Sequence, residues 1–147
     1  MKTIVLTIIL TSLLSSTNIS AVTPKNTIYN NIEVLENGYK KEYITYNEET
    51  SRIVSKITYQ YDRKGNMQKR VFYKWDYDCG WKAIQKYEYT YNNEKRLNYI
   101  THTKWDKKSK NWATKSERLK HIYNNEGKLV AINKIQIDGN SELIALK

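Results

Sequence analysis

The feature that most constrains this chain is a strand-and-turn pattern that is fully developed in residues 56–91 and restated on both sides of that stretch. Apolar and polar residues alternate along it, which is the period of a strand with one buried face. Two interruptions, at 62–66 and 76–80, carry the Asp, Asn and Gly residues that tight turns need. The pattern predicts antiparallel strands joined by short turns.

The same turn recurs along the chain. Tyr61, Tyr91 and Tyr123 each close a predicted strand and lead through a polar turn to a new apolar residue. A second kind of turn, at 76–80 and 106–111, lies between two tryptophans. Copies separated by about 30 residues are typical of a chain built by repetition of one supersecondary unit. Each unit is predicted to be a pair of strands with two different turns.

These repeats predict an all-β fold, an antiparallel meander of about seven or eight strands without a helix in the mature chain. Uncovered aromatic rings would forgo more free energy than the roughly 5–15 kcal/mol that stabilises a domain. The sheet is therefore expected to curl into a barrel or half-barrel. Uninterrupted alternation would gather one set of side chains on its inner face, namely Tyr59, Tyr61, Val71, Tyr73, Tyr87, Tyr89, Leu97 and Tyr99, together with Trp81 and Ala83. A bulge is expected near 116–117, where the interval from tryptophan to tyrosine grows by one residue.

Residues 1–21 are expected to be a cleaved secretory signal peptide. Lys2 gives a short positive start, residues 3–14 form an apolar run, and Ala21 supplies the small residue that signal peptidase requires. The run is shorter than the ~20 residues of a membrane span, and no later segment offers a transmembrane alternative. The mature chain, residues 22–147, is long enough for one domain and too short for two. We therefore expect an exported single-domain protein.

The chain carries a formal charge of +10 at pH 7. In a cytoplasmic protein such an excess favours nucleic acid as the partner, but an exported protein meets anionic lipid headgroups, acidic polysaccharides and acidic proteins instead. Nucleic acid is therefore disfavoured, and a glycan or another exported protein is the expected partner. Outward-facing lysines can equally keep a sheet soluble and prevent edge-to-edge pairing, so the charge alone does not define a site.

Residues with catalytic or metal-binding chemistry are few and scattered. The two histidines, His102 and His121, have no spaced set of Cys, Asp or Glu around them. Cys79 is the only cysteine, so no internal disulfide is possible, and it stands in a turn that is expected to be exposed. Three aspartates that could form a carboxylate pair for sugar hydrolysis fit the role of turn formers better; they are Asp76, Asp78 and Asp106. No catalytic residue, metal site or cofactor is predicted.

The strongest candidate for a binding surface is the pair of tryptophan turns. Trp75 and Trp81 flank one turn and are predicted to be cross-strand neighbours, and the next hairpin repeats the arrangement at one common end of the meander. The predicted binding residues are Trp75, Trp81, Trp105, Trp112, Lys74, Lys82 and Lys104. Rings flanked by polar groups suit sugar faces or a protein partner. The competing interpretation is that each tryptophan pair only staples its hairpin.

Three classes of function are compatible with this sequence. The leading class is a non-catalytic binding or accessory module of the periplasm or cell surface, which would use the tryptophans and their neighbouring lysines. The second is a structural or assembly protein whose sheet meets another copy, which would make it a homo-oligomer. The least favoured class is an enzyme, because no phosphate loop, Ser-His-Asp order or dinucleotide fingerprint is present.

Two resemblances add to this interpretation. Residues 59–66, with the order Tyr-x-Tyr-Asp-x-x-Gly-Asn, resemble the unit of the YD or Rhs-type repeats of secreted bacterial proteins, whose hairpins build extended sheets. Asn92 and Asn124 stand where that unit has aspartate, and Lys95 replaces its glycine, so a large Rhs shell is not implied. The mature chain is also similar to a family of small exported proteins of gut Bacteroidetes that is catalogued as a domain of unknown function. This resemblance implies export in a Gram-negative bacterium and carries no activity, cofactor or catalytic residue.

Overall fold

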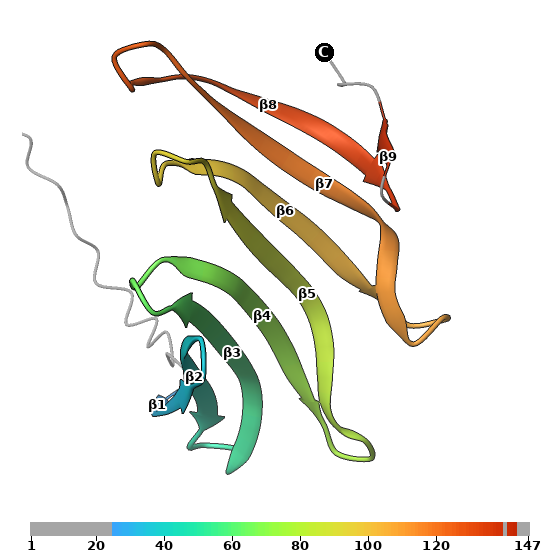
Figure 1. The fold of residues 1–147 in the computed structure, drawn as a ribbon. Helices are drawn as coiled ribbons and strands as arrows, with labels where there is room; N and C mark the ends of the chain where they lie inside the picture. The colour runs from blue at the N-terminus through green and yellow to red at the C-terminus, as the bar shows by residue number, and fades with distance from the viewer. Residues whose placement is uncertain (1–24, 140, 144–147) are drawn as a thin grey trace, which may run out of the picture.

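The computed structural model describes residues 25–139 and 141–143, which form one nine-stranded antiparallel sheet in which every strand pairs with its neighbours in sequence (Figure 1). The strands are β1 (Asn26–Leu35), β2 (Gly38–Asn47), β3 (Arg52–Asp62), β4 (Met67–Asp76), β5 (Gly80–Tyr91), β6 (Leu97–Asp106), β7 (Asn111–Tyr123), β8 (Leu129–Asp138) and the short β9 (Ser141–Leu143). The predicted all-β meander is confirmed, and the described part contains no helix. The predicted signal peptide, residues 1–21, lies outside the described residues.

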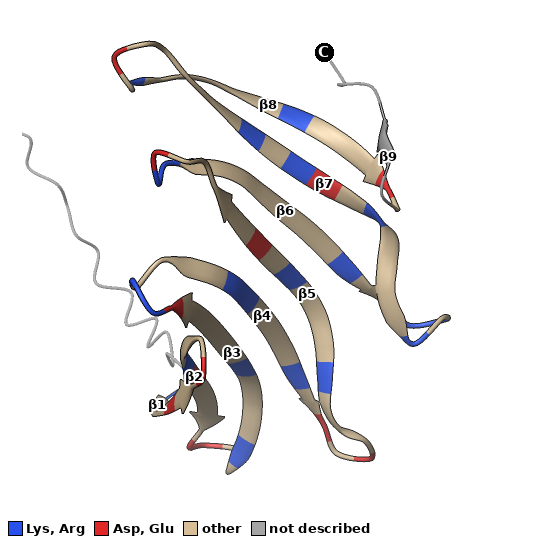
Figure 2. Cartoon of the chain, in the orientation of Figure 1, with Lys and Arg blue, Asp and Glu red and all other residues tan. Residues whose placement is uncertain are grey.

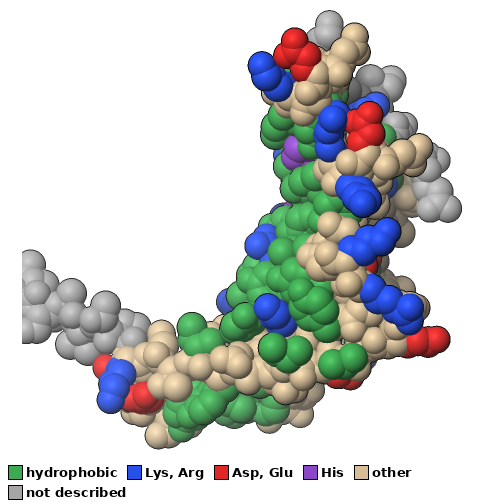
Figure 3. Space-filling view, turned by 60° about the vertical axis from the view of Figure 1, so that its left-hand side comes forward, with side chains coloured by type: hydrophobic (Ala, Val, Ile, Leu, Met, Phe, Trp, Pro, Cys, Tyr) green, Lys and Arg blue, Asp and Glu red, His purple; other side chains and the backbone are tan. Residues whose placement is uncertain are grey.

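The sheet is curled but open. β1 and β9 are its two edges and do not pair with each other, so no barrel is closed. Figure 3 shows a bend between the arm that carries the first strands and the arm that carries the last, with hydrophobic side chains gathered along the inner side of the bend. The curled form of the prediction is therefore correct, and the closed barrel does not occur.

Cross-strand register divides the side chains between two faces, because directly opposed residues of an antiparallel pair lie on the same side. We name the tyrosine face after six residues that the register places together: Tyr39, Tyr43, Tyr59, Tyr61, Tyr87 and Tyr89. We name the tryptophan face after Trp75, Trp81, Trp105 and Trp112, which share the opposite side with Val71. Each face therefore carries its own aromatic set.

The single aromatic face expected from uninterrupted alternation is wrong. Val71 and Tyr73 lie on the tryptophan face, whereas Tyr59 and Tyr87 lie on the tyrosine face. Two register shifts are the reason: one between Gln60 and Tyr61, where β4 contributes an extra residue, and one between Phe72 and Tyr73, where β5 does. Such a bulge reverses the side of every later side chain in its strand. Similar shifts occur in six of the eight strand pairs. The shift expected near 116–117 lies instead at residues 113–115, opposite Lys104, whereas Ser116 and Glu117 are regularly paired with Thr103 and His102.

The buried core of the described residues lies on the tryptophan face. Val71, Ile135 and Ile137 are the buried apolar side chains, with exposed fractions of 5%, 8% and 5%. Thr103, which is 4% exposed, lies among them and shares a hydrogen bond of 2.8 Å with Ser116. The core is small because a single layer has no second sheet or helix to cover it. Long side chains must therefore shield much of the apolar surface.

Two families of turns close the hairpins, one at each end of the strands. Six of the turns begin with an Asp or Asn whose side-chain oxygen accepts backbone N–H groups, for instance Asn92 Oδ1 from Glu94 and Arg96 at 3.0 and 2.9 Å. Asp62 and Asn124 open their turns in the same way. At the other end, the turns that begin at Asn47, Asp76 and Asp106 repeat this device. The repetition seen in the sequence is thus a repetition of turn chemistry.

Lys95 provides a test of this turn geometry. It adopts a left-handed φ of 62° at the position where the sister turns have Gly65 and Gly127, at 85° and 78°. A side chain in this region costs about 1 kcal/mol or more, whereas glycine adopts it without strain at a smaller entropic cost. Lys95→Gly is expected to raise the free energy of unfolding by roughly 0.5–1 kcal/mol, measured by urea denaturation. Lys95→Ala is the control, and equal stabilities of the two variants would contradict the assigned conformation.

Candidate functional site

The structure places the four tryptophans in two cross-strand pairs, as predicted. Trp75 lies opposite Trp81 with ring centroids 5.0 Å apart, and Trp105 lies opposite Trp112 at 5.1 Å. Both contacts are edge-to-face, the geometry that aromatic pairs prefer. The pairs lie at the same end of the meander and on the same face. They remain separate, because the register of β5 with β6 extends only as far as Gln85 and the two hairpin ends diverge beyond it.

The lysines that were predicted beside the tryptophans lie on the other face. Lys74 precedes Trp75 and Lys104 precedes Trp105, and neighbouring residues of a strand point to opposite sides. Lys82 lies opposite Lys74 in the register and forms a 2.6 Å ion pair with Asp76. The combined site of tryptophans and these three lysines is therefore not assembled. Sequence adjacency was mistaken for spatial adjacency on one face.

Two other lysines cover the tryptophans. The Lys56 ammonium lies 4.6 Å from the ring centre of Trp81, and the Lys86 ammonium lies 5.2 Å from that of Trp112. Both ammonium groups are also held by carboxylates on the same face, Glu42 at 3.4 Å and Glu88 at 2.8 Å. The rings are half-buried, and their lysines are already engaged. This arrangement favours the stapling role for the tryptophans.

The tyrosine face has a different character. Its rings are half-buried and contact one another across the strands, with Tyr39 stacked on Tyr61 at 4.8 Å and Tyr43 edge-on to Tyr59 at 5.7 Å. Burial raises the pKa of the Tyr61 hydroxyl above its ordinary value, so this hydroxyl remains a hydrogen-bond donor at neutral pH. No other layer of the described chain covers this face. It presents flat apolar rings with polar edges, the combination that binds sugars.

Most of the positive charge on the tyrosine face in β2 to β6 is left without carboxylate partners. Lys82 is ion-paired with Asp76, but four other basic residues have no acidic group within ion-pair distance in the described part of the chain, namely Lys41, Arg70, Lys74 and Lys104. The mid-strand carboxylates Glu42 and Glu88 lie on the tryptophan face, where they pair with lysines. Glu117 of β7 lies on the tyrosine face opposite His102 and pairs with Lys134 at 3.0 Å. Figure 2 shows the basic residues distributed along the strands and many of the acidic residues in the turns. In β2 to β6, lysines of the tryptophan face are therefore ion-paired with carboxylates, whereas most basic residues of the tyrosine face have no carboxylate partner among the described residues.

Arg70 is the centre of this basic surface. Its guanidinium lies 4.5 Å from the ring centre of Tyr87 and 5.0 Å from that of Phe72, a stacking geometry that arginine adopts readily. Its Nε is shielded from solvent and donates to no atom of the described chain. A buried donor without a partner is costly.

His102 extends the surface into β6. Its ring stacks on Tyr87 at 4.7 Å, and its Nε2 lies 3.0 Å from Gln85 Oε1. Burial lowers the pKa of His102 below its ordinary value, and the nearby Lys104 and Lys134 act in the same direction, against the opposing effect of Glu117. The imidazole is therefore neutral at pH 7. Sequence reasoning treated this histidine as an ordinary strand residue and did not place it beside a tyrosine.

The lowered pKa of His102 makes stability depend on pH. The unfolded chain takes up this proton at a higher pH than the folded chain does, so the free energy of unfolding should fall as the pH decreases from about 7.5 to about 5.5. His102→Gln should remove part of that decrease. The measurement is urea denaturation of both proteins at several pH values. An identical pH dependence of the two proteins would show that His102 does not contribute.

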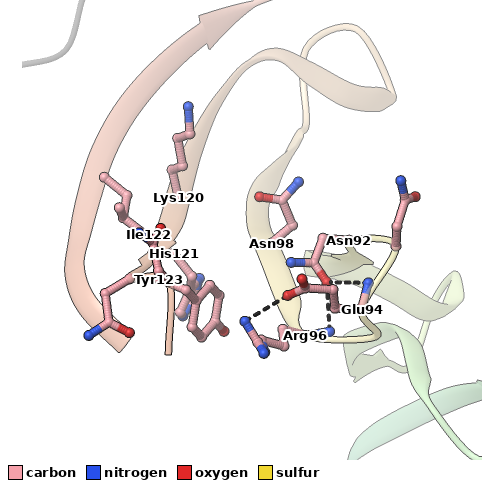
Figure 4. Close-up of a pocket in the computed structure, with 11 residues that line it drawn as sticks. Asn92, Glu94, Arg96, Asn98, Lys120, His121, Ile122 and Tyr123 are labelled. Atoms are coloured by element: carbon pink, nitrogen blue, oxygen red, sulfur yellow. Dashed lines mark hydrogen bonds and ion pairs between the residues drawn. The ribbon is translucent and has the colours of Figure 1, made fainter. Parts of the chain in front are cut away.

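A polar pocket lies beside the turn between β5 and β6 (Figure 4). Asparagines and basic residues line it, including Asn92, Asn98, Arg96 and Lys120. Arg96 is ion-paired with Glu94 at 2.6 Å, and Asn92 is engaged in closing the turn. The Nδ1 atom of His121, which also lines the pocket, is shielded from solvent and has no hydrogen-bond partner in the described chain. Because Arg96 and Asn92 are already engaged and the pocket contains few aromatic rings, it is a weaker candidate than the tyrosine face.

The residues examined for catalytic or metal chemistry are dispersed or occupied by turns. Asp76 accepts backbone N–H groups from Asp78 and Cys79 at 3.2 and 3.0 Å, and its hydrogen bond from Lys82 holds the pKa of its carboxyl below the ordinary value. Asp106 receives comparable bonds in the next turn of this family. No group of three or more metal-ligating side chains gathers within the described residues. These aspartates have the geometry of turn formers.

Cys79 is an exposed free thiol in the turn between β4 and β5, as expected. It should react completely with a thiol reagent in the folded state, because no side chain covers it. Protein purified without reductant should also contain some disulfide-linked dimer. Mass spectrometry after labelling without denaturant checks both points. Protection of the thiol until denaturant is added would contradict this turn geometry.

No protein-family model, curated protein or solved structure matches the chain. Within the residues that the structure describes, there is also no helix with the length and apolar character needed to cross a membrane.

Proposed function

We propose that the protein is a non-catalytic binding or accessory module of the periplasm or cell surface, exported by the signal in residues 1–21, and that it binds a glycan or another exported protein through an aromatic and basic surface. The tyrosine face is that surface. The observation that carries the proposal is a layer of tyrosines interleaved with cations that have no carboxylate partners. The tryptophan face, in contrast, contains the core, and Lys56 and Lys86 on it are ion-paired with Glu42 and Glu88.

Energetics supports an external partner for the tyrosine face. Aromatic side chains carry large apolar surface areas, and burial of each square ångström of apolar surface contributes about 25 cal/mol to the free energy of binding. The single-layer sheet leaves both aromatic faces without a covering layer, and on the tyrosine face this free energy is available for binding a partner. Unpaired cations beside the rings add orientation and specificity, because a partner that lacks complementary charge would leave them desolvated.

A glycan array and a capture experiment with exported proteins of the source organism test this proposal. We expect specific retention of wild-type protein that is lost in the double variant Tyr59→Ala with Tyr87→Ala. The matched control is Tyr77→Ala, since Tyr77 is an exposed tyrosine in a turn outside the tyrosine face. Retention that survives the double variant would place the binding surface elsewhere.

The edge strand β1 favours a second candidate function, a structural or assembly role through self-association. Ile28, Ile32 and Val34 are 61%, 60% and 85% exposed, and β1 pairs only with β2. The strand contains no lysine, arginine or proline, the residues that usually protect such edges. Sedimentation should then detect a dimer that Ile32→Lys dissociates and Asn93→Lys, in an exposed turn, does not. A monomer at all concentrations would exclude this role.

A further inference from the structure

One row of opposed residues crosses five strands of the tyrosine face. The register places Lys41 opposite Tyr59, Tyr59 opposite Arg70, Arg70 opposite Tyr87, and Tyr87 opposite His102. Cation and ring alternate along the row from β2 to β5, and the neutral ring of His102 follows in β6, opposite Glu117 of β7. Neighbouring strands lie about 4.8 Å apart, so Lys41 and Arg70 are separated by about 10 Å along it. The row runs perpendicular to the strands.

The groups of this row are prepared for an anionic ligand. Lys41 lies 5.7 Å from the ring centres of both Tyr39 and Tyr61 without an acidic partner. Arg70 lies against the rings of Phe72 and Tyr87 and has no acidic partner in the described part of the chain. Guanidinium groups held in this way bind carboxylate or sulfate oxygens with defined geometry.

Resting on the proposed binding function, we propose that this row binds a linear acidic glycan that lies across the strands. Sugar rings pack on Tyr59 and Tyr87, and acid groups on alternate sugars meet Lys41 and Arg70. The spacing matches, because a sugar unit in an extended chain is about as long as one strand spacing. The ligand class is therefore a polysaccharide that carries carboxylate or sulfate groups at regular intervals.

The alternation of cation and ring favours a glycan over single-stranded nucleic acid. Proteins that bind single strands follow the phosphate backbone with one basic groove and stack the bases on aromatic residues beside it. Charge and flat surface then form two parallel tracks. In this row the cations and the aromatic rings alternate along a single line of residues. The sugar rings and acid groups of a charged polysaccharide likewise follow one another along a single chain.

The test compares two forms of one ligand. Binding of an oligogalacturonate and of its methyl-esterified form, which lacks the charges, is measured by calorimetry at low salt, with oligothymidylate as a third ligand. We expect the acid form to bind at least tenfold more tightly than the ester. Lys41→Gln and Arg70→Gln should each weaken the acid form by about tenfold, the effect of one charge-assisted hydrogen bond. Lys120→Gln, a control on the tryptophan face, should change it by less than twofold.

Each alternative outcome overturns a defined statement. Equal affinity for acid and ester would overturn the acidic ligand class while leaving glycan binding intact. Tighter binding of oligothymidylate than of the acid glycan would assign the row to nucleic acid instead. Binding of no glycan, together with capture of an exported protein, would overturn this inference alone, whereas no binding in any assay would also overturn the proposed function. In the described part of the chain, Lys41 contacts the rings of Tyr39 and Tyr61 and forms no ion pair, so Lys41→Gln is expected to fold. Its affinity therefore tests the inference even if Arg70→Gln fails to fold.

Discussion

Gly38→Ala is expected to lower the free energy of unfolding by about 2–4 kcal/mol, a large effect for the addition of one methyl group. Gly38 has a φ of 146° and opens β2 opposite Asp62. An added Cβ would lie 1.9 Å from the carbonyl oxygen of Tyr61 and 2.9 Å from backbone atoms of Asp62. Backbone atoms cannot rotate away as a side chain can, so the β2–β3 pairing must be displaced.

Gly65→Ala is the matched control for this prediction. Gly65 also has a positive φ, 85°, but an added Cβ would meet nothing within 4 Å. Only the left-handed strain remains, which costs about 1–2 kcal/mol. Thermal and urea denaturation measure both variants. Equal destabilisation of the two would show that the close approach of β2 and β3 at Gly38 does not exist in solution.

Trp81→Ala is expected to cost about 2–3 kcal/mol of stability, because it removes a half-buried ring, its edge-to-face partner contact and the surface covered by Lys56. Trp112→Ala should behave in the same way in the next hairpin, since its contacts with Trp105 and Lys86 are equivalent. Binding to the tyrosine face should change by less than twofold in the fraction that remains folded. Denaturation and calorimetry of the same samples separate the two effects.

Lys82→Ala is the control for the tryptophan variants. Lys82 adjoins Trp81 in sequence, is exposed, and belongs to the opposite face, where its ion pair with Asp76 is open to solvent. Surface pairs of this kind contribute at most about 1 kcal/mol. If Trp81→Ala instead kept full stability and abolished binding, the tryptophans would be the binding site and their stapling role would be rejected.

Local chemistry explains what the sequence could predict. The period of two, the Asx turns and the placement of tryptophans on both sides of one turn depend only on neighbouring residues, so the meander and the Trp75–Trp81 contact followed directly. The left-handed residue of each turn is also visible, because Gly65 and Gly127 occupy equivalent positions in the repeats. Lys95 shows that the turn tolerates a side chain where the sequence departs from glycine.

The division into two faces could not be predicted, because it depends on bulges. The extra residue of β5 that lies opposite the interval between Phe72 and Tyr73 separates Tyr87 from Trp81, although both occupy odd positions of one strand. No residue type marks this bulge in the sequence. If this bulge is left out of the register, Arg70 does not fall in one row with Tyr87 and His102. The lysines next to the tryptophans in sequence are then mistaken for their partners.

The closed barrel was expected because uncovered rings are costly within one molecule. The structure reduces that cost in another way, by stacking rings on cations and on each other, as Arg70 does with Tyr87 and Tyr39 with Tyr61. The remaining exposed area is retained on the tyrosine face. An open sheet is therefore consistent with a protein that completes its burial when it binds a partner.

The most direct test of this account is an NMR titration of ¹⁵N-labelled protein with an oligogalacturonate. The account predicts that the Arg70 Nε–H signal and the backbone signals around Tyr87 and His102 shift during the titration, while the indole N–H signals of Trp75, Trp81, Trp105 and Trp112 keep their positions. Shifts of the indole signals without change at Arg70 would contradict it and assign ligand binding to the tryptophan face.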